Sequence, residues 1–209
     1  MNIAIIAANG RLGKVLVEEA LAAGHTVRAG IRGESGLTPH PKLEVVQCDA
    51  TQPDDLRQLV QGQQVIFSAI GHVKGSTASV QTKATQILLG VMDELGLQRF
   101  VDVTGTGVRF PGDKISLVDR ILNFAVGVID PTRVKDGRDH MAVLKASHVN
   151  WTTIRLLKLQ NIAAHPFELR LHGPTKWYVG RREVARAMLE VAEKGTFIKQ
   201  SPIISRSHL

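Results

Sequence analysis

Residues 2–31 decide the fold, and they read NIAIIAANGRLGKVLVEEALAAGHTVRAGI. Residues 2–7 form a short apolar run rich in β-branched residues, which is typical of a strand buried on both faces of a sheet. Residues 11–23 carry apolar side chains at helical spacing, and Gly24 stops that helix. Residues 26–31 return to strand character. The stretch therefore predicts a strand, a helix and a second strand in succession.

The same alternation of strands and helices continues along the rest of the chain. Alternation at this spacing predicts βαβ units, which are right-handed and cover both faces of a parallel sheet with helices. We therefore expect an α/β fold with a doubly wound parallel sheet, formed by one domain over residues 1–209. Such a sheet binds its ligand outside the carboxyl ends of its strands. Further strands are expected at 43–47, 65–70, 99–103, 151–156 and 203–205, and further helices at 53–60, 77–95, 115–128, 132–146 and 182–193.

Composition narrows the classes of partner. The chain has 26 Lys and Arg against 19 Asp and Glu, and its net charge of +7 favours anionic partners such as phosphates. Aromatic residues make up 4%, too few for a platform that stacks single-stranded nucleic acid, so nucleic acid is not expected as a partner. Cys48 is the single cysteine, which excludes an internal disulfide framework, and it is expected to be a small buried hydrophobe.

Neither a metal site nor a membrane or targeting segment is expected. The eight histidines form no metal-ligand pattern, so no metal is expected. The chain shows neither a signal-peptide pattern nor a run of about 18 apolar residues, so we expect a soluble, cytoplasmic protein with no membrane partner.

The loop after the first strand, residues 7–13, reads AANGRLG and is typical of a phosphate-binding turn. Its small residues let the backbone approach a pyrophosphate, and Gly13 lets the helix pack close to the strand. The helix N-terminus offers free N–H groups and the positive end of its dipole. Ala7 stands where the usual pattern has its first Gly, and we expect it to keep a negative φ. The alternative is a tight turn with no ligand.

The end of the second strand distinguishes between the two nicotinamide cofactors. Sites for NAD usually place Asp or Glu here for the ribose 2′-hydroxyl, whereas this chain has Arg32, which fits the 2′-phosphate of NADP. We therefore expect NADP as the cofactor, with NADPH preferred over NADH; the alternative is a solvated surface Arg. After the third strand, Asp49 is expected either to accept from the adenine amino group, with Ala50 beside the ring, or to cap the loop.

The fourth and fifth strands end in small and hydroxyl-bearing residues. Residues 69–71 would leave space for the ribose near the nicotinamide, and Thr104 could meet a carboxamide or a substrate, or serve as a turn residue. His72 and His140 could each face the cleft, although a lone histidine is more often structural or exposed.

Several segments together resemble the atypical short-chain dehydrogenase/reductases, and within them the NAD(P)H-binding group that includes NmrA-like regulators and biliverdin-IXβ/flavin reductase. The similarity runs through nearly the whole chain, including its tail at 179–205. The segments that carry it are IAIIAANGRLGKVLVEEALAAGHTVRAGIR at 3–32, VVQCDATQPDDL at 45–56, VIFSAIG at 65–71, RFVDVTGTG at 99–107 and LKASHVNWTTIRLLKL at 144–159.

This resemblance implies a Rossmann domain with a small substrate region built from the C-terminal third. It also implies cofactor contacts by position, to which Gly13 adds its packing role in the phosphate turn. The implied contacts are at Asn9, Gly10, Arg11, Leu12, Arg32, Asp49, Ala50, Ala69, Ile70, Gly71 and Thr104.

The sequence departs from the family at its catalytic pair, because no Tyr-x-x-x-Lys is present. The only tyrosine, Tyr178, is followed three residues later by Arg181, and Gly137 stands where many relatives have Lys. Since that pair gives a proton to a carbonyl as hydride arrives, ordinary alcohol dehydrogenation is not expected. A flavin takes hydride at a ring nitrogen, and solvent can supply its proton.

The resemblance and its departures together predict an NADPH-dependent oxidoreductase that reduces a planar or conjugated small-molecule acceptor, such as a flavin or quinone. The catalytic candidates are Thr104, His140 and Lys158, the last at a position where flavin-reductase relatives carry a cleft residue. Lys158 could orient or charge-stabilise an anionic acceptor. The alternative is a non-catalytic NADP(H)-binding redox sensor of the NmrA-like kind, which the missing Tyr–Lys pair favours.

Overall fold

The structure, a computed structural model, describes residues 1–73, 75–114, 116–175 and 178–206. Its main sheet has eight strands in the order β3-β2-β1-β4-β5-β6-β10-β8, and each neighbouring pair is parallel except β10 with β8. This arrangement confirms the doubly wound, mostly parallel sheet. The strands are β1 (Asn2–Ile6), β2 (Thr26–Ile31), β3 (Leu43–Gln47), β4 (Val65–Ser68), β5 (Arg99–Gly105), β6 (Asn150–Leu156), β8 (Phe167–Arg170) and β10 (Ile203–Arg206), while β7 (Leu159–Gln160) pairs with β9 (Val179–Gly180) in a separate small sheet.

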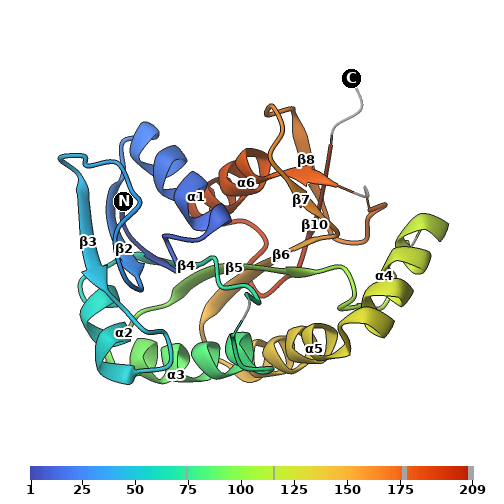
Figure 1. The fold of residues 1–209 in the computed structure, drawn as a ribbon, viewed down its shortest axis with the longest axis horizontal. Coiled ribbons are helices and arrows are strands. Elements are labelled where there is room, and N and C mark those ends of the chain that lie inside the picture. The colour runs from blue at the N-terminus through green and yellow to red at the C-terminus, as the bar shows by residue number, and fades with distance from the viewer. Residues whose placement is uncertain (74, 115, 176–177, 207–209) are drawn as a thin grey trace.

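Helices cover both faces of the sheet (Figure 1). The first face carries α1 and α6 against one apolar core, and the second carries α2, α3 and α5 against another. The remaining helix, α4, projects beyond the end of the sheet. The helices are α1 (Arg11–Ala22), α2 (Pro53–Val60), α3 (Val80–Glu94), α4 (Leu117–Ile129), α5 (Pro131–Ala146) and α6 (Arg181–Glu193).

The alternation of side chains along β1 explains why its sequence is almost wholly apolar. Ile3 and Ile5 belong to the core under α1 and α6, whereas Ala4 and Ile6 belong to the opposite core. Because both faces of this central strand are covered, every one of these positions is apolar. The strand can therefore be recognised from its own sequence, without knowing which strands pair with it.

Two of the boundaries that differ from the expected ones lie beside the first cavity. β4 ends at Ser68, two residues short of the expected end, and the released residues line a cavity. Helix α3 begins at Val80 instead of residue 77, where the Asp136 carboxylate accepts the first free N–H groups, those of Gln81 and Thr82. The expected helix start at Ile115 lies outside the described residues, and α4 begins at Leu117 behind a Ser116 cap.

The short strands of the C-terminal third have no counterpart in the expected set. β8 reads FELR, an alternation of only four residues, and it pairs antiparallel with β10 at the sheet edge. β7 and β9 have two residues each. Runs this short carry too little periodicity to separate a strand from a loop.

Candidate functional site

The carboxyl ends of the central strands meet where the strand order reverses, because β1 lies between β2 and β4. This is the place where an open α/β sheet forms its ligand crevice. Two cavities occupy it, one of about 250 Å³ and one of about 410 Å³. Both are lined by Ile70 and Gly71, so the two cavities adjoin at the end of β4.

The turn after β1 corrects one expectation. Ala7 has a φ of +59°, so the expectation of a negative φ is wrong. The turn must return the Ala7 carbonyl oxygen to accept the Gly10 N–H at 3.0 Å, while the Ala8 N–H donates to the Gly30 carbonyl of β2 at 3.0 Å. These bonds hold Ala7 in the left-handed region, at a cost of about 1–2 kcal/mol for a residue with a Cβ atom.

Gly13 fixes how closely α1 approaches β1. A Cβ atom at this position would lie 2.3 Å from the Ala7 carbonyl oxygen and 2.7 Å from the Ala8 Cα atom. No side chain can be accommodated there without moving the helix. Gly13 and the buried Leu12 therefore lie beneath the turn and line neither cavity.

The first cavity brings together most of the expected cofactor residues. It is lined at one end by the β1 turn and at the other by the ends of β2 and β3. Among the described lining residues, Arg32 and Asp49 are the charged ones, and Arg32 is exposed. The expected residues found here are Asn9, Gly10, Arg32, Asp49, Ala50, Ala69, Ile70 and Gly71.

Asn9 joins this turn to the segment after β2. Its side-chain amide donates to the Glu34 carbonyl at 2.8 Å, and its oxygen accepts the Gly36 N–H at 3.1 Å. The two bonds hold residues 34–36 against the phosphate turn and so restrain the loop that begins at Arg32.

Asp49 acts as a cap. Its Oδ1 atom accepts the Thr51 N–H at 2.9 Å and the Thr51 hydroxyl at 2.8 Å, and these bonds hold the Asp49 pKa below its ordinary value. Its expected contact with adenine stays a prediction. Beside it, burial and then the charges of Asp55 and Asp49 raise the pKa of Cys48 to about 12. The Cys48 thiol is therefore protonated at neutral pH and is not an activated nucleophile.

The second cavity lies between the ends of β5 and β6 and the helices α4 and α5. Thr104 lines it at the end of β5, and Gly137 of α5 faces that hydroxyl, since a Cβ atom at Gly137 would lie 3.1 Å from Thr104 Oγ1. If Gly137 holds the place of the family's Lys, the Tyr four residues earlier corresponds to Arg133, which also lines the cavity. Neither position carries a Tyr or a Lys.

The second cavity is positively charged and largely apolar. No Asp or Glu belongs to its described lining, which contains the cations Arg11, Arg133, Lys158 and Arg181. Burial, and then the charge of Arg11, lower the pKa of Arg181, whose guanidinium donates to Asn161 Oδ1 at 2.6 Å. The apolar walls come from Val103, Val108, Val126, Val134, Leu156, Leu157 and Leu159.

His140, one of the three catalytic candidates, lies outside both cavities. Its side chain is fully buried between α5 and β5, with Nε2 2.6 Å from Asp102 Oδ2. Thr104 and Lys158, by contrast, both line the second cavity. Tyr178 lines neither cavity.

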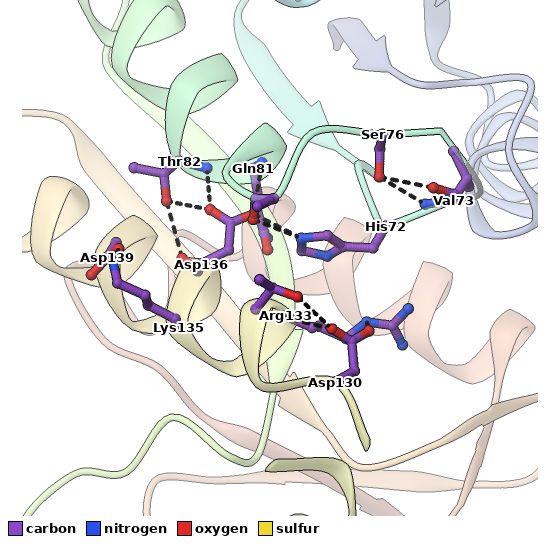
Figure 2. A network of polar contacts seen from close by, with 12 residues as sticks. His72, Val73, Ser76, Gln81, Thr82, Asp130, Arg133, Lys135, Asp136 and Asp139 are labelled. Carbon is purple, nitrogen blue, oxygen red and sulfur yellow. Dashed lines mark hydrogen bonds and ion pairs between the residues drawn. The ribbon is translucent and has the colours of Figure 1, made fainter. Parts of the chain in front are cut away.

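His72, which the sequence left undecided, lines the second cavity directly after Gly71. Figure 2 shows its ring pointing toward Asp136 of α5, with Nε2 3.0 Å from Asp136 Oδ2. No sequence motif links these two residues, so the sequence carries no signal for the contact. Among the described residues, no group of three or more His, Cys, Asp or Glu could hold a metal ion.

The fold and the two cavities define an NAD(P)-binding Rossmann protein of the atypical short-chain dehydrogenase/reductase class. The family model described as NAD(P)H-binding matches residues 7–194, and the chain belongs to that family. No helix among the described residues has the length and apolar character that crossing a membrane requires.

Curated relatives share part of the chain. A 3β-hydroxysteroid dehydrogenase/Δ5→4-isomerase of Mycobacterium tuberculosis is 33% identical over 127 residues, covering 55% of this chain and 34% of the relative. A 3β-hydroxysteroid dehydrogenase of Mycolicibacterium neoaurum is 31% identical over 135 residues, covering 59% and 37%. The chain thus spans about a third of the length of the curated relatives it matches.

Solved structures share the fold over the whole chain at low identity. An oxidoreductase of Lactococcus lactis has a TM-score of 0.83 at 16% identity, covering 99% of this chain and 91% of that one. A short-chain dehydrogenase/reductase of Veillonella parvula in complex with NADP has a TM-score of 0.81 at 18% identity, covering 98% and 94%. A Streptococcus pneumoniae protein described as a candidate NADH-flavin reductase has a TM-score of 0.78 at 22% identity, covering 99% and 100%.

Proposed function

We propose that the chain is an NADPH-dependent oxidoreductase that reduces a planar or conjugated acceptor, such as a flavin or a quinone. The observation that carries this proposal is the junction of the two cavities at Ile70 and Gly71. A dinucleotide in the first cavity would present its nicotinamide at that junction, beside the apolar second cavity. When bound, the nicotinamide supplies a hydride.

The residues of the first cavity fit this cofactor. The turn at residues 7–13 and the N-terminus of α1 would hold the diphosphate, because Gly13 lets α1 pack close against the backbone of Ala7 and Ala8. Arg32 would bind the 2′-phosphate, and Asp49 with Ala50 would bind the adenine. Residues 69–71 would contact the ribose next to the nicotinamide, and Thr104 its carboxamide.

The second cavity favours an acceptor that needs no Tyr–Lys pair. Its valine and leucine walls suit a flat, apolar ring system, and Arg133, Lys158 and Arg181 would orient an anionic substituent. Holding the acceptor against the cofactor is the main catalytic contribution available to such a site. A hydroxysteroid dehydrogenase activity is not proposed, because the chain matches only about a third of those relatives and lacks the pair.

The test is stopped-flow oxidation of NADPH with a panel of flavins, quinones and aldehydes, together with NADP reduction by secondary alcohols. We expect turnover with flavins or quinones and none with alcohols, since the Tyr–Lys pair that takes the alcohol's proton is absent and acid–base catalysis of this kind contributes about 10²–10⁴-fold in rate. Rapid oxidation of a plain secondary alcohol would contradict the proposal.

A second function, a non-catalytic NADP(H) sensor, is favoured by one observation. Gly137 and Arg133, which the resemblance places where relatives carry Lys and Tyr, line the second cavity without a side chain that matches either. A sensor would bind NADPH tightly and oxidise it with no acceptor in the panel. That combination would replace the reductase proposal with the sensor.

A further inference from the structure

His72 and Asp136 form a pair at the edge of the second cavity (Figure 2). His72 comes from the loop after β4 and Asp136 from α5, and their side chains meet with Nε2 3.0 Å from Oδ2. Asp136 is completely buried, and 13% of the His72 side chain is exposed. One member is therefore fixed within the protein, and the other reaches the space where an acceptor would bind.

The Asp136 carboxylate is rigidly placed. Oδ2 accepts the Gln81 N–H at 3.0 Å, and Oδ1 accepts the Thr82 N–H at 3.0 Å and the Thr82 hydroxyl at 2.5 Å. The start of α3 thus holds the carboxylate, and the carboxylate holds the His72 ring. A carboxylate that engages Nε2 leaves Nδ1 as the ring nitrogen that exchanges a proton.

The position of His72 relates it to the reacting centre. Gly71, directly before it, lines both cavities at their junction, where the nicotinamide would lie. His72 lines the second cavity together with Thr104 and Gly137. It is the one histidine in the described lining of either cavity, and no Tyr or Cys lines the second.

We propose that His72, positioned by Asp136, donates the proton in the two-electron reduction of a quinone bound in the second cavity. This inference rests on the proposed function. The quinone takes up the hydride supplied by NADPH, which leaves as NADP⁺, while the His72 ring, protonated on both nitrogens, gives its Nδ1 proton to the quinone oxygen on which negative charge develops. Hydride and proton together yield the neutral hydroquinone, and His72 is left as the neutral ring. Solvent reprotonates the ring through its exposed edge.

The chemistry of the two acceptors makes quinone reduction, and not flavin reduction, the reaction that depends on His72. Reduction of a quinone places negative charge on an oxygen, which a positioned proton donor neutralises directly. A flavin receives the hydride at a ring nitrogen and forms an anion that persists at alkaline pH without a protein acid. Comparing the rates with the two acceptors therefore distinguishes a loss of proton donation, which slows the quinone alone, from a loss of cofactor binding or hydride delivery, which slows both.

The charged groups around the pair do not replace it. Asp130 and Arg133, at the start of α5, bond to each other, with Arg133 Nε 3.3 Å from Asp130 Oδ2, and Lys135 pairs with Asp139 on the exposed side (Figure 2). A purely structural role for His72, anchoring the start of the loop after β4, at Gly71 and His72, to α5, would affect both acceptors alike.

The experiment compares His72→Gln with His148→Gln, a matched change at an exposed histidine that lines neither cavity. Single-turnover NADPH oxidation at pH 8 is followed with 1,4-naphthoquinone and with lumiflavin. We expect His72→Gln to slow the quinone reaction by about 10²-fold or more, with the lumiflavin rate and the NADPH Kd within about twofold of wild type. His148→Gln should leave all three unchanged.

A cofactor-free measurement tests the pair by itself. Long-range ¹H–¹⁵N NMR of the histidine rings reports which nitrogen carries the proton, and His72→Gln assigns the signal. In the neutral ring that remains after proton donation we expect a fixed Nε2–H tautomer, because Asp136 holds the Nε2 proton and leaves Nδ1 to take up and give the transferred one. We expect loss of that preference in Asp136→Asn while circular dichroism shows a folded protein. A freely exchanging tautomer in the wild type would overturn the assignment.

The outcomes separate this inference from the proposed function. If the wild type reduces both acceptors and His72→Gln slows neither, or slows both equally, His72 is not the donor, and the reductase proposal stands. A wild type that reduces lumiflavin but not the quinone also overturns the inference alone. If the wild type binds NADPH and reduces neither acceptor, the reductase proposal and this inference fall together.

Discussion

The Arg32 guanidinium is the one group that we expect to make the protein bind NADPH more tightly than NADH. It lies at the end of β2 and lines the first cavity. Among the described lining residues of that cavity, Asp49 is the one carboxylate. Arg32→Ala should weaken NADPH binding by about 1.5–3 kcal/mol, the scale of a lost charge-assisted contact, and should leave NADH affinity nearly unchanged. Fluorescence titration of both cofactors is the measurement.

The control for this change is Arg138→Ala, which removes an exposed guanidinium of α5 that lines neither cavity. Arg138→Ala removes the same positive charge as Arg32→Ala, but at a place outside the cofactor site that we propose. Equal affinity of the wild type for NADPH and NADH, or equal effects of the two substitutions, would contradict the assignment of Arg32.

Ala7 provides a second prediction for a single residue, because it holds a positive φ of +59° with a Cβ atom. Ala7→Gly removes about 1–2 kcal/mol of backbone strain and adds about 0.5–1 kcal/mol of unfolded-chain entropy. The free energy of unfolding should therefore stay the same or rise by up to about 1.5 kcal/mol in urea denaturation. Ala8→Gly, at a fully buried neighbour without positive φ, should instead destabilise; equal losses in both would refute the strain argument.

At the scale of elements, the site depends on how closely α1 approaches β1. A Cβ atom at Gly13 would overlap the Ala7 carbonyl oxygen at 2.3 Å. Gly13→Val should push α1 away from the turn, destabilise the fold by about 1–3 kcal/mol or more, and abolish NADPH binding. Calorimetric titration and thermal unfolding measure the two effects.

Gly90→Val is the matched control within a helix. Gly90 lies in α3, and a Cβ atom there would meet no other atom within 4 Å, so the same change should alter stability by no more than about 0.5 kcal/mol. A Gly13→Val variant that binds NADPH as tightly as Gly90→Val would remove the turn at residues 7–13 from the cofactor site.

The same scale explains what the sequence could predict. The βαβ frame and the phosphate turn follow from apolar runs, helical spacing and small residues that lie within about 30 positions of one another. Arg32 and residues 69–71 follow from their place at strand ends. The φ of Ala7 does not follow, because a hydrogen bond between Ala8 and Gly30 of a neighbouring strand helps set it.

Contacts between segments far apart in the chain could not be predicted from the sequence either, because they depend on how the helices and strands pack. His72 and Asp136 are 64 positions apart, and their meeting depends on α5 packing beside the start of α3. The burial of His140 against Asp102 likewise depends on where α5 crosses β5. Residue type and local spacing carry no information about either contact, so the lining of the second cavity was less predictable than that of the first.

At the scale of the whole molecule, Arg155 of β6 joins the loop after β5 to the C-terminal third. Its guanidinium pairs with Asp113 through Nη1–Oδ2 at 2.5 Å and Nη2–Oδ1 at 2.9 Å, with side chains 1% and 3% exposed. The same group donates to the carbonyls of Val108, Leu171 and Ser201 at 3.2, 2.7 and 2.9 Å. One side chain of β6 thus ties the loop after β5 to two segments of the C-terminal third.

Asp113→Asn should therefore destabilise the molecule as a whole, by about 3–5 kcal/mol at pH 7, because it leaves the Arg155 charge buried without its partner. Asp139→Asn, in the exposed pair with Lys135, should cost no more than about 0.5 kcal/mol. Urea denaturation of both variants measures the difference. Similar small losses in the two would show that the Arg155–Asp113 pair does not hold the C-terminal third in place.

The pH dependence of this loss has a defined sign. Burial acts to raise the Asp113 pKa, but bonds from Arg155 and the Phe110 N–H, with His172 nearby, outweigh it and hold the pKa below its ordinary value. A carboxyl with a lowered folded pKa contributes stability that is present above its unfolded pKa of about 3.9 and is lost as pH falls through the folded value. The stability gap between wild type and Asp113→Asn should therefore be widest near neutral pH and should shrink below about pH 4. Urea midpoints measured from pH 7 to pH 3 follow it, and a gap that stays constant or widens in acid would mean that Asp113 is not the carboxylate that binds Arg155.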